Sequence, residues 1–297
     1  MNIRVSAGTA MCLGLTSGKA MEYPTTAYLM IPGGVCRGGC TFCPQAKGDS
    51  KWLSRVSWPE YKIDEVVDAL KGSDLQRICV QCPDIPDYEN ILLETVQILK
   101  DTGKPISVSS PPLSRDILDS LKGYIDRIGI GIDGATDDIR AKVKPRYDPR
   151  VFWDYLGAAV ESVGAERVTA HFIVGLGESL PQLTLSAYRA LNTGAGVSLF
   201  SYMAEEGVPD MRYYRQAQMS SHLLKKGLSP SEILMLLKDR PEQLAEFMED
   251  KDIFRTQGCP GCNRPYYTTR PGQEHRNYPR PLTGDEFEKI KEELTGM

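Results

Sequence analysis

Strand-like and helix-like segments alternate along most of the chain, and this alternation limits the possible folds more than any other feature. Short apolar runs predict six strands, at residues 26–32, 77–81, 105–110, 127–133, 167–178 and 197–203. Amphipathic segments predict the helices between them, at residues 58–72, 91–103, 114–123, 151–164 and 183–196. Strict alternation implies a parallel sheet with helices outside it. We therefore expect an α/β fold, a TIM-type parallel barrel of six or more βα units that is closed or partial.

The pattern changes after residue 203. Residues 211–249 predict helices with a turn at which Ser229 or Ser231 caps the second helix. Residues 258–282 are rich in Pro, Arg and Tyr and lack regular periodicity, and residues 284–297 predict a terminal helix. The irregular stretch is too short to build a core of its own. We expect a barrel with an amino-terminal extension at residues 1–210, followed at 211–297 by a helical cap and a cysteine-containing tail attached to it.

The composition is that of a soluble globular protein. Of the 297 residues, 41% are hydrophobic and 25% are charged, which is enough apolar material for a full core. The net charge of -4 offers no basic field for nucleic acid, and no apolar run approaches the length of a bilayer span. The amino terminus also lacks the apolar core of a secretory signal. We therefore expect a cytoplasmic protein with no nucleic-acid or membrane partner.

Three of the eight cysteines stand close together in the stretch GVCRGGCTFCPQ, which contains Cys36, Cys40 and Cys43. Disulfides are not expected, because the cytosol keeps thiols reduced. Three thiolates on one short loop suit a cubic iron–sulfur cluster whose fourth iron is open to another molecule. The alternative is a zinc ion whose fourth ligand is a remote cysteine or histidine.

The loop C-R-G-G-C-T-F-C, with an aromatic residue just before the last cysteine, resembles the signature of the radical SAM superfamily. The resemblance implies a 4Fe-4S cluster whose open iron binds S-adenosyl-L-methionine (SAM). In that family, reductive cleavage of SAM gives a 5′-deoxyadenosyl radical, which removes hydrogen from an unactivated carbon. The cofactors carry the difficult chemistry, and the protein supplies orientation and a dry cavity.

Three strand segments, PISVSS, GIDGATDDIRAKVKPRYD and FIVGLGES, resemble the SAM-binding strands of radical SAM enzymes, in particular biotin synthase. By this likeness the SAM pocket contains Phe42, the backbone of Cys43, Ser107, Ser109, Asp133, Arg140, Ile173 and Met203. Other roles are open, because the two serines share a strand face and could satisfy core hydrogen bonds. Asp133 would also suit a turn, and Arg140 a solvated basic face. His171, central in the fifth strand, is expected to be a core histidine.

Cys259 and Cys262 in the tail stretch GCPGCNRPYY supply half of a second metal site, either structural zinc or a second iron–sulfur cluster. We favour the cluster, with Cys12 or Cys82 as a further ligand, and with Ser6, Thr269 and Arg270 as weaker candidates. Cys79 and Cys82 are three positions apart on a strand and so point to opposite faces. Cys82 is nearer the reactive end of the strand, so we expect Cys79 in the core.

Stretches near both ends of the chain resemble the biotin-synthase-like proteins that act as two-component lipoyl synthases. These stretches are RVSAGTAMCLGL, PTTAYLM, QAKGDSKWLSRVSWP and GCPGCNRPYYTTRPG. The resemblance implies a sulfurtransferase that inserts sulfur into a protein-bound octanoyl chain and consumes the second cluster as the sulfur source. The implied partners are an octanoylated lipoyl domain or H-protein, a second radical SAM protein, and ferredoxin or flavodoxin as electron donor. Tail residues would either dock the carrier or anchor the tail: Tyr266, Tyr267, Tyr278, Arg264, Arg270 and Arg280.

Two alternatives stay open. Biotin synthase inserts sulfur into a small molecule, but it builds its second cluster from cysteines on several strands and an arginine, and here only the second strand carries cysteine. A non-catalytic iron–sulfur scaffold for a partner enzyme would need no SAM site, and the SAM-like strands argue against it. Single-chain lipoyl synthase fits less well, because its amino-terminal three-cysteine motif and carboxy-terminal serine motif are absent.

Overall fold

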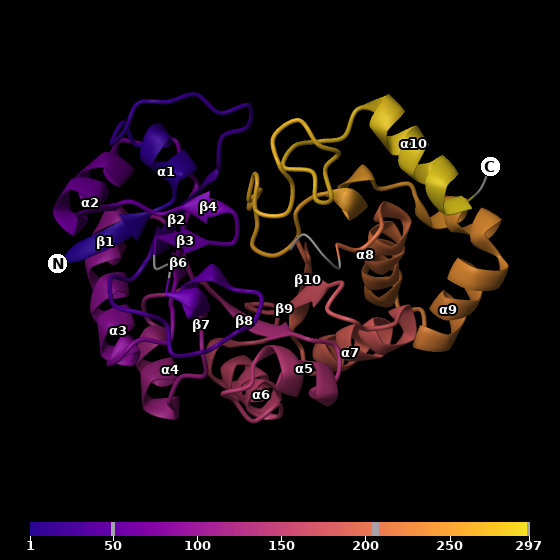
Figure 1. Ribbon diagram of the computed structural model, residues 1–297, viewed down its shortest axis with the longest axis horizontal. Coiled ribbons are helices and arrows are strands. Elements are labelled where there is room, and N and C mark those ends of the chain that lie inside the picture. Colours follow the sequence, from indigo (N-terminus) through magenta and orange to yellow (C-terminus); the bar gives the residue numbers. More distant parts are fainter. Residues whose placement is uncertain (49–50, 204–207, 296–297) are drawn as a thin grey trace.

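The computed structural model describes residues 1–48, 51–203 and 208–295, and an eight-stranded sheet forms its centre (Figure 1). Six strands run parallel, in the order β2 (Thr26–Met30), β6 (Arg77–Gln81), β7 (Ile106–Ser110), β8 (Arg127–Asp133), β9 (Val168–Val174) and β10 (Gly196–Ser201). Next to β2, the antiparallel strands β1 (Asn2–Val5) and β5 (Glu60–Lys62) extend the sheet. In the described part of the chain no ladder joins β10 to β5. The expected α/β fold is confirmed, with the sheet open rather than closed.

The helices expected between the strands are all present. They are α2 (Ile63–Lys71), α3 (Tyr88–Leu99), α4 (Arg115–Leu121), α6 (Val151–Val163) and α7 (Leu180–Asn192). Helix α2 begins later than the sequence pattern suggests, because Glu60–Lys62 pair with β1 as β5 instead. Helix α5 (Asp137–Val143) was not expected, since its short polar sequence has almost no apolar period; Thr136 caps it by accepting from the backbone N–H of Ile139.

Several short elements were also not expected from the sequence. They are α1 (Ala7–Cys12), the hairpin strands β3 (Trp52–Leu53) and β4 (Val56–Ser57), and the 3₁₀ segments η1 (Pro44–Lys47), η2 (Lys100–Thr102), η3 (Pro241–Phe247) and η4 (Lys251–Phe254). Each is too short to show a hydrophobic period. Together with β1, the helix α1 fills the side of β2 that faces away from β6.

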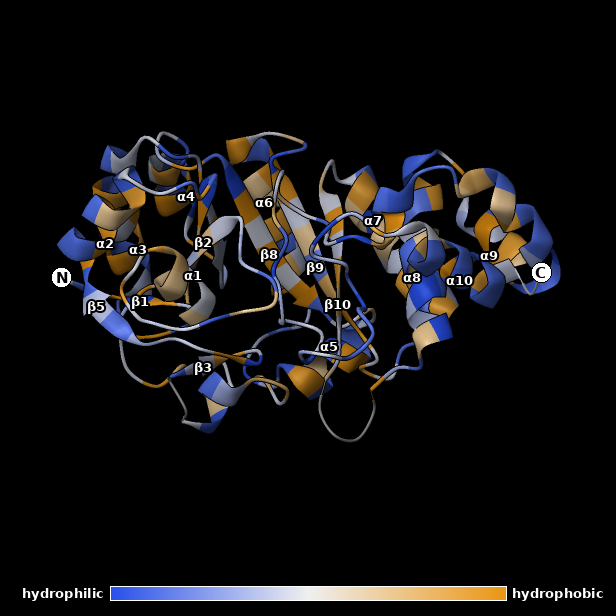
Figure 2. Ribbon diagram, turned by 90° about the horizontal axis from the view of Figure 1, so that it is seen from above, coloured by the Kyte–Doolittle hydropathy of each residue, from blue (hydrophilic) through white to orange (hydrophobic). Residues whose placement is uncertain are grey.

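Hydrophobic residues occupy two regions, one on each face of the sheet. The larger lies between the strands and the surrounding helices, and Figure 2 shows the hydrophobic residues along β8, β9 and β10. The smaller, on the opposite face, contains Tyr28, Met30, Trp58 and Tyr267. Tyr267 belongs to the tail, and its ring centre lies 5.3 Å from that of Tyr28. An aromatic residue of the tail therefore packs inside the curve of the sheet.

Three carboxy-terminal helices follow β10 (Figure 1): α8 (Met211–Lys225) packs against α7 and β10, α9 (Pro230–Asp239) against α7 and α8, and α10 (Gly284–Thr295) against α8. Ser229 caps α9 in a capping box with Glu232, as one of the two expected serines. The last two residues of the expected terminal helix, 296–297, lie outside the described residues. Among the described residues, no helix is both long and apolar enough to cross a membrane.

The tail bridges β2 and β10, the first and last strands of the parallel series. The backbone N–H of Arg264 donates to the Tyr28 hydroxyl on β2 at 2.8 Å, and its guanidinium donates to the Ser198 hydroxyl on β10 at 2.8 Å. Asn263 accepts from the backbone N–H of Thr25 and donates to the carbonyl of Tyr23. The irregular stretch thus fills the gap that the open sheet leaves.

Arg215 on α8 offers a test of how the tail is held. Its side chain has no exposed surface, and its guanidinium donates to Oε1 of Gln218 and to the carbonyls of His275 and Arg276. Arg215→Met leaves these acceptors unpaired, so we expect a loss of about 2–4 kcal/mol in the free energy of unfolding, measured by urea denaturation. Arg212→Met, at an exposed position of the same helix, is the control. Equal urea midpoints for the two variants would contradict the anchoring role.

Candidate active site

A cavity of about 460 Å³ lies inside the curve of the sheet, and all six parallel strands contribute to its wall. Mostly every second residue of each strand faces it, as the alternation of a strand requires. The cysteines that line it form two groups, one including the loop after β2 and the other including the tail. Ser109, Gly129, His171, Ile173 and Phe200 also line the cavity. One enclosed space thus joins both cysteine motifs of the sequence.

The first group is Cys36, Cys40 and Cys43, on the loop that leaves the carboxyl end of β2. Burial raises the pKa of the Cys40 thiol to about 12 and also raises that of Cys43. Backbone N–H groups of Gln45 and Ala46 point at the Cys43 sulfur and oppose this rise in its pKa. Buried thiols of this kind become stable thiolates when a metal centre supplies positive charge.

Contacts behind the loop hold it in place. Asp84 accepts from the guanidinium of Arg37 at 2.8 Å and from the Tyr147 hydroxyl at 2.6 Å. Gly39 has a positive φ of 65°, and a side chain there would meet Arg146, whose guanidinium donates to the carbonyl of Arg37. The three thiols are therefore presented to the cavity by a fixed backbone, which suits a three-ligand 4Fe-4S cluster.

The second group is Cys79 on β6 with Cys259 and Cys262 in the tail. Burial raises the pKa of the Cys79 thiol, and the two tail cysteines raise it further. The Cys259 sulfur lies 3.2 Å from the Ser107 hydroxyl, and the Cys262 sulfur 3.2 Å from the Tyr28 hydroxyl. Burial raises the pKa of the Cys262 thiol as well, and the positive charges of Arg264 and Arg77 oppose the rise at both Cys79 and Cys262. Three neighbouring thiols with cations and hydroxyls around them suit an anionic metal–thiolate centre.

Neither cysteine expected to complete the tail pair lies beside it. The Cys12 sulfur is 4.0 Å from the carbonyl of Pro24 and packs against the larger core. The Cys82 sulfur lies 4.0 Å from the carbonyl of Tyr88, near enough to Cys36 for electrostatic interaction. The choice of Cys82 over Cys79 is thus corrected: the tail meets β6 in the middle of the strand, not at its carboxyl end.

The residues expected at SAM fall into three sets. Phe42, Cys43, Ser109, Asp133, Ile173 and Met203 all line the cavity. Ser107 lines it too, but at the second cysteine group, where it accepts from the guanidinium of Arg77 at 2.8 Å. Arg140 does not line it, because its buried guanidinium donates to the carbonyls of Gly134 and Pro149 inside its own loop. Arg140 is thus neither a SAM contact nor a solvated residue.

Lys144, which follows Arg140 in the same basic stretch, reaches the cavity where Arg140 does not. Its Nζ atom lies 2.6 Å from Asp133, and it is almost fully buried beside Cys40. The sequence signal was present, since Lys144 lies one helical turn after Arg140, but a short polar helix was not expected there.

Among the described residues, no three or more Cys, His, Asp and Glu side chains lie close enough to hold a single metal ion.

The model of the radical SAM superfamily matches residues 30–183, which is more than half of the chain. The chain belongs to the radical SAM superfamily. Membership implies a 4Fe-4S cluster and SAM as cofactors, and the cavity described above begins at the three-cysteine loop that this family uses. No curated protein is significantly similar to the chain.

Several solved radical SAM enzymes are similar in fold. A methyltransferase from Sphaerobacter thermophilus is 19% identical, with a TM-score of 0.52 over 68% of this chain and 65% of the methyltransferase. SuiB from Streptococcus suis, solved with SAM bound, is 10% identical, with a TM-score of 0.51 over 69% of this chain and 46% of SuiB. Methylornithine synthase is 17% identical, with a TM-score of 0.49 over 61% of this chain and 55% of the synthase. The match spans less than two thirds of each enzyme, and at these identities it shows the radical SAM fold alone.

His171 gives a pH-dependent test of the cavity. Burial lowers its pKa to about 3, with Arg264 and Lys144 adding to the effect. Between pH 6.5 and 3 the unfolded chain binds a proton that the folded chain does not, so stability falls on acidification, by about 2 kcal/mol from this group between pH 7 and 5. We expect the NMR signal of His171 to stay constant between pH 8 and 5, and His171→Gln to flatten the stability profile. A His171 signal that titrates near 6.5 would contradict a dry, cationic cavity.

Proposed function

We propose that the chain is a radical SAM sulfurtransferase that inserts sulfur into an unactivated C–H bond, most readily of a protein-bound octanoyl chain. One observation carries the proposal: a second group of three thiols, Cys79, Cys259 and Cys262, faces the same cavity as the radical SAM loop. A methyl transfer or a simple hydrogen abstraction needs no second set of thiols inside the sheet. A sulfur insertion does, because a sulfur donor must lie within reach of the carbon that loses hydrogen.

Cys36, Cys40 and Cys43 would hold the SAM-binding 4Fe-4S cluster, and Cys79, Cys259 and Cys262 a second iron–sulfur cluster. When bound there, the first cluster with SAM supplies the 5′-deoxyadenosyl radical that takes hydrogen from the substrate, and the second cluster supplies the sulfur. Arg264 or Ser107 stands beside the second group as a candidate fourth ligand. Zinc at the second group is the outcome that would remove the sulfur donor.

The chain's own residues prepare the space between the two groups. The Asp133 and Lys144 pair lies at the loop end, where the polar groups of SAM would bind. Ile173 and Phe200 give the space between the groups an apolar wall, and His171 is neutral at physiological pH. Apolar and neutral side chains around the substrate would shield a carbon radical from solvent and from side reactions. The carrier protein, the second radical SAM protein and the ferredoxin or flavodoxin donor are part of the same proposal.

Iron and sulfide content tests the second cluster. After anaerobic reconstitution, a Cys36→Ala, Cys40→Ala, Cys43→Ala variant should retain about four iron atoms per chain. Adding Cys79→Ala, Cys259→Ala and Cys262→Ala should remove them. Cys12→Ala and Cys82→Ala are the matched controls, which should keep the full iron content of the unaltered protein. Two results would contradict the assignment. One is zinc in place of iron in the variant with three cysteines replaced, and the other is an undiminished iron content in the variant with all six replaced.

The fate of sulfur tests the reaction itself. The protein is reconstituted with sulfide enriched in a heavy isotope and reduced with SAM and an N-octanoyl-lysyl peptide or an octanoylated carrier domain. We expect 5′-deoxyadenosine and a thiolated octanoyl chain carrying the heavy isotope, both measured by mass spectrometry. Cys259→Ala should still cleave SAM but yield no thiolated product. SAM cleavage without C–S bond formation in the unaltered protein would favour another radical reaction, and no cleavage with any substrate would favour an iron–sulfur scaffold.

A further inference from the structure

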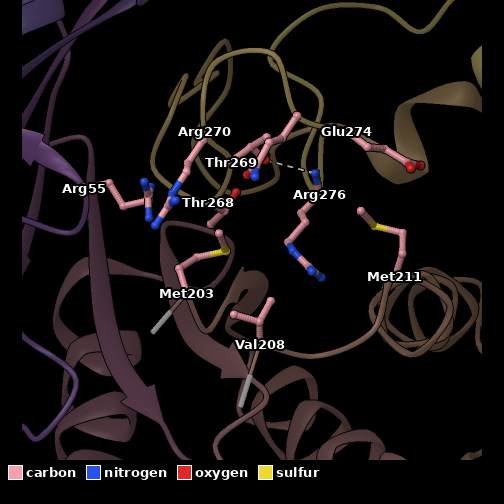
Figure 3. Close-up of a pocket in the computed structure, with 10 residues that line it drawn as sticks. Arg55, Met203, Val208, Met211, Thr268, Thr269, Arg270, Glu274 and Arg276 are labelled. Atoms are coloured by element: carbon pink, nitrogen blue, oxygen red, sulfur yellow. Dashed lines mark hydrogen bonds between the residues drawn. The ribbon is translucent and has the colours of Figure 1, made fainter. Parts of the chain in front are cut away.

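A second cavity, of about 560 Å³, adjoins the active-site cavity and shares Arg55, Met203 and Thr268 with it. Figure 3 shows its walls, which come from three parts of the chain. Arg55 lies just before β4, Met203 follows β10, and tail residues between 268 and 276 close the other side. A molecule that enters the active site past the end of β10 would therefore meet this cavity.

Three guanidinium groups line the cavity, those of Arg55, Arg270 and Arg276. Arg55 and Arg270 extend toward each other in Figure 3. Burial lowers the pKa of Arg55, and the like charge of Arg270 lowers it further. Within residues 1–48, 51–203 and 208–295, none of the three arginines forms an ion pair. Arg55 and Arg270 therefore face each other as like charges, with no ion-paired carboxylate among the described residues.

Two of these guanidinium groups also carry buried donors that are not used. Nε of Arg55 and Nη1 of Arg276 are shielded from solvent and have no acceptor in the described part of the chain. A buried, unpaired charged donor costs about 1–3 kcal/mol or more, so folded proteins rarely keep one without a use. The backbone of Arg276 is itself fixed, because its N–H donates to the Thr269 hydroxyl at 3.1 Å, the dashed line in Figure 3. The backbone that carries one of the two unused donors is therefore fixed.

Glu274 is the acidic residue among those lining the cavity, and it is already engaged elsewhere. Its carboxylate lies 2.9 Å from Nζ of Lys289 and 4.0 Å from the guanidinium of Arg215. It raises the pKa of Arg276, but burial is the larger effect and the pKa stays lowered. The described residues that line the cavity therefore carry more positive than negative charge.

The opposite wall is apolar. Met203, Val208 and Met211 line it, and Val208 is 38% exposed. Methionine side chains adapt to aliphatic ligands of different shape. A cationic wall facing an aliphatic one matches a ligand that has an anionic group beside a hydrocarbon chain.

We propose that Arg55, Arg270 and Arg276, here called the arginine pocket, bind a carboxylate that is joined to or stands beside the aliphatic chain of the substrate. Planar guanidinium groups suit a carboxylate because each offers paired N–H donors. The carboxylate has two possible sources. It is either the free end of a fatty-acid-like substrate or an acidic side chain next to an acylated lysine on a carrier, and the second source rests on the proposed function.

Binding to the reconstituted protein, measured by isothermal titration calorimetry at low salt, tests the proposal with two pairs of probes. The first pair is octanoate and octanamide. The second is an N-octanoyl-lysyl peptide flanked by Asp and Glu and the same peptide with Asn and Gln. We expect the unaltered protein to bind the charged member of at least one pair about tenfold more tightly, as one or two charge-assisted hydrogen bonds provide. Preference for octanoate identifies the free carboxylate, and preference for the acidic peptide identifies the carrier.

Arg55→Gln, Arg270→Gln and Arg276→Gln should each reduce this preference severalfold, and Arg276→Lys, which keeps the charge, should restore part of it. Arg240→Gln, at an exposed position beyond α9, should leave it unchanged. A melting temperature no lower than that of the unaltered protein checks that each variant folds, since removing a like charge relieves repulsion. Three results would overturn the proposal. The unaltered protein would bind both members of each pair equally, or Arg240→Gln would lose as much preference for the charged probe as the pocket variants, or inorganic phosphate would bind as tightly as the charged probes.

The binding test and the proposed function can fail separately. If the second cysteine group binds zinc, the sulfurtransferase assignment fails while the charged probes still bind the arginine pocket. If neither pair of probes is distinguished, the pocket assignment fails while iron content and sulfur transfer are unaffected.

Discussion

The structure depends on one contact set, in which the irregular tail is held between the first and last strands of an open parallel sheet. Arg264 bonds to β2 through its backbone and to β10 through its side chain, and Tyr267 packs against Tyr28 and Trp58. A parallel sheet that does not close leaves unfilled volume on its concave face. Filling that volume with the tail places Cys259 and Cys262 opposite β6, and the same insertion positions the residues around Arg276. The cavity, the second thiol group and the arginine pocket thus share one cause.

The charge arrangement inside the sheet follows from this insertion. Arg77 and Arg264 act on the thiols of Cys79 and Cys262, and Asp133 pairs with Lys144 beside Cys40. His171 stays neutral because burial, Arg264 and Lys144 all oppose its protonation. In a medium of low dielectric constant, charges at two separated points act strongly on whatever is bound between them. A substrate held there would meet an uncharged interval bounded by two charged ends.

The repeating features of this fold could be predicted from the sequence, while features that depend on distant contacts could not. All six parallel strands and their five helices follow from hydrophobic period, and the three-cysteine loop from spacing alone. Arg140 was misplaced because its neighbours form a short helix, α5, with a polar first turn. Cys79 was assigned to the core because strand alternation shows which residues share a face, not which face the tail will cover. The positions of Lys144 and of the tail arginines Arg270 and Arg276 could not be predicted for the same reason, because packing between distant segments sets them.

Cys79 on β6 and Cys82, the residue that follows the strand, both line the cavity, at two levels. Cys79 stands among the tail cysteines, while Cys82, three residues further, stands on the side of the three-cysteine loop. Since a strand rises by about 3.3 Å per residue, these levels are separated by about 10 Å. Under the proposed function, the hydrogen atom would leave near the three-cysteine loop and the new C–S bond would form near the tail cysteines, so the reacting carbon of a substrate would lie between these two levels.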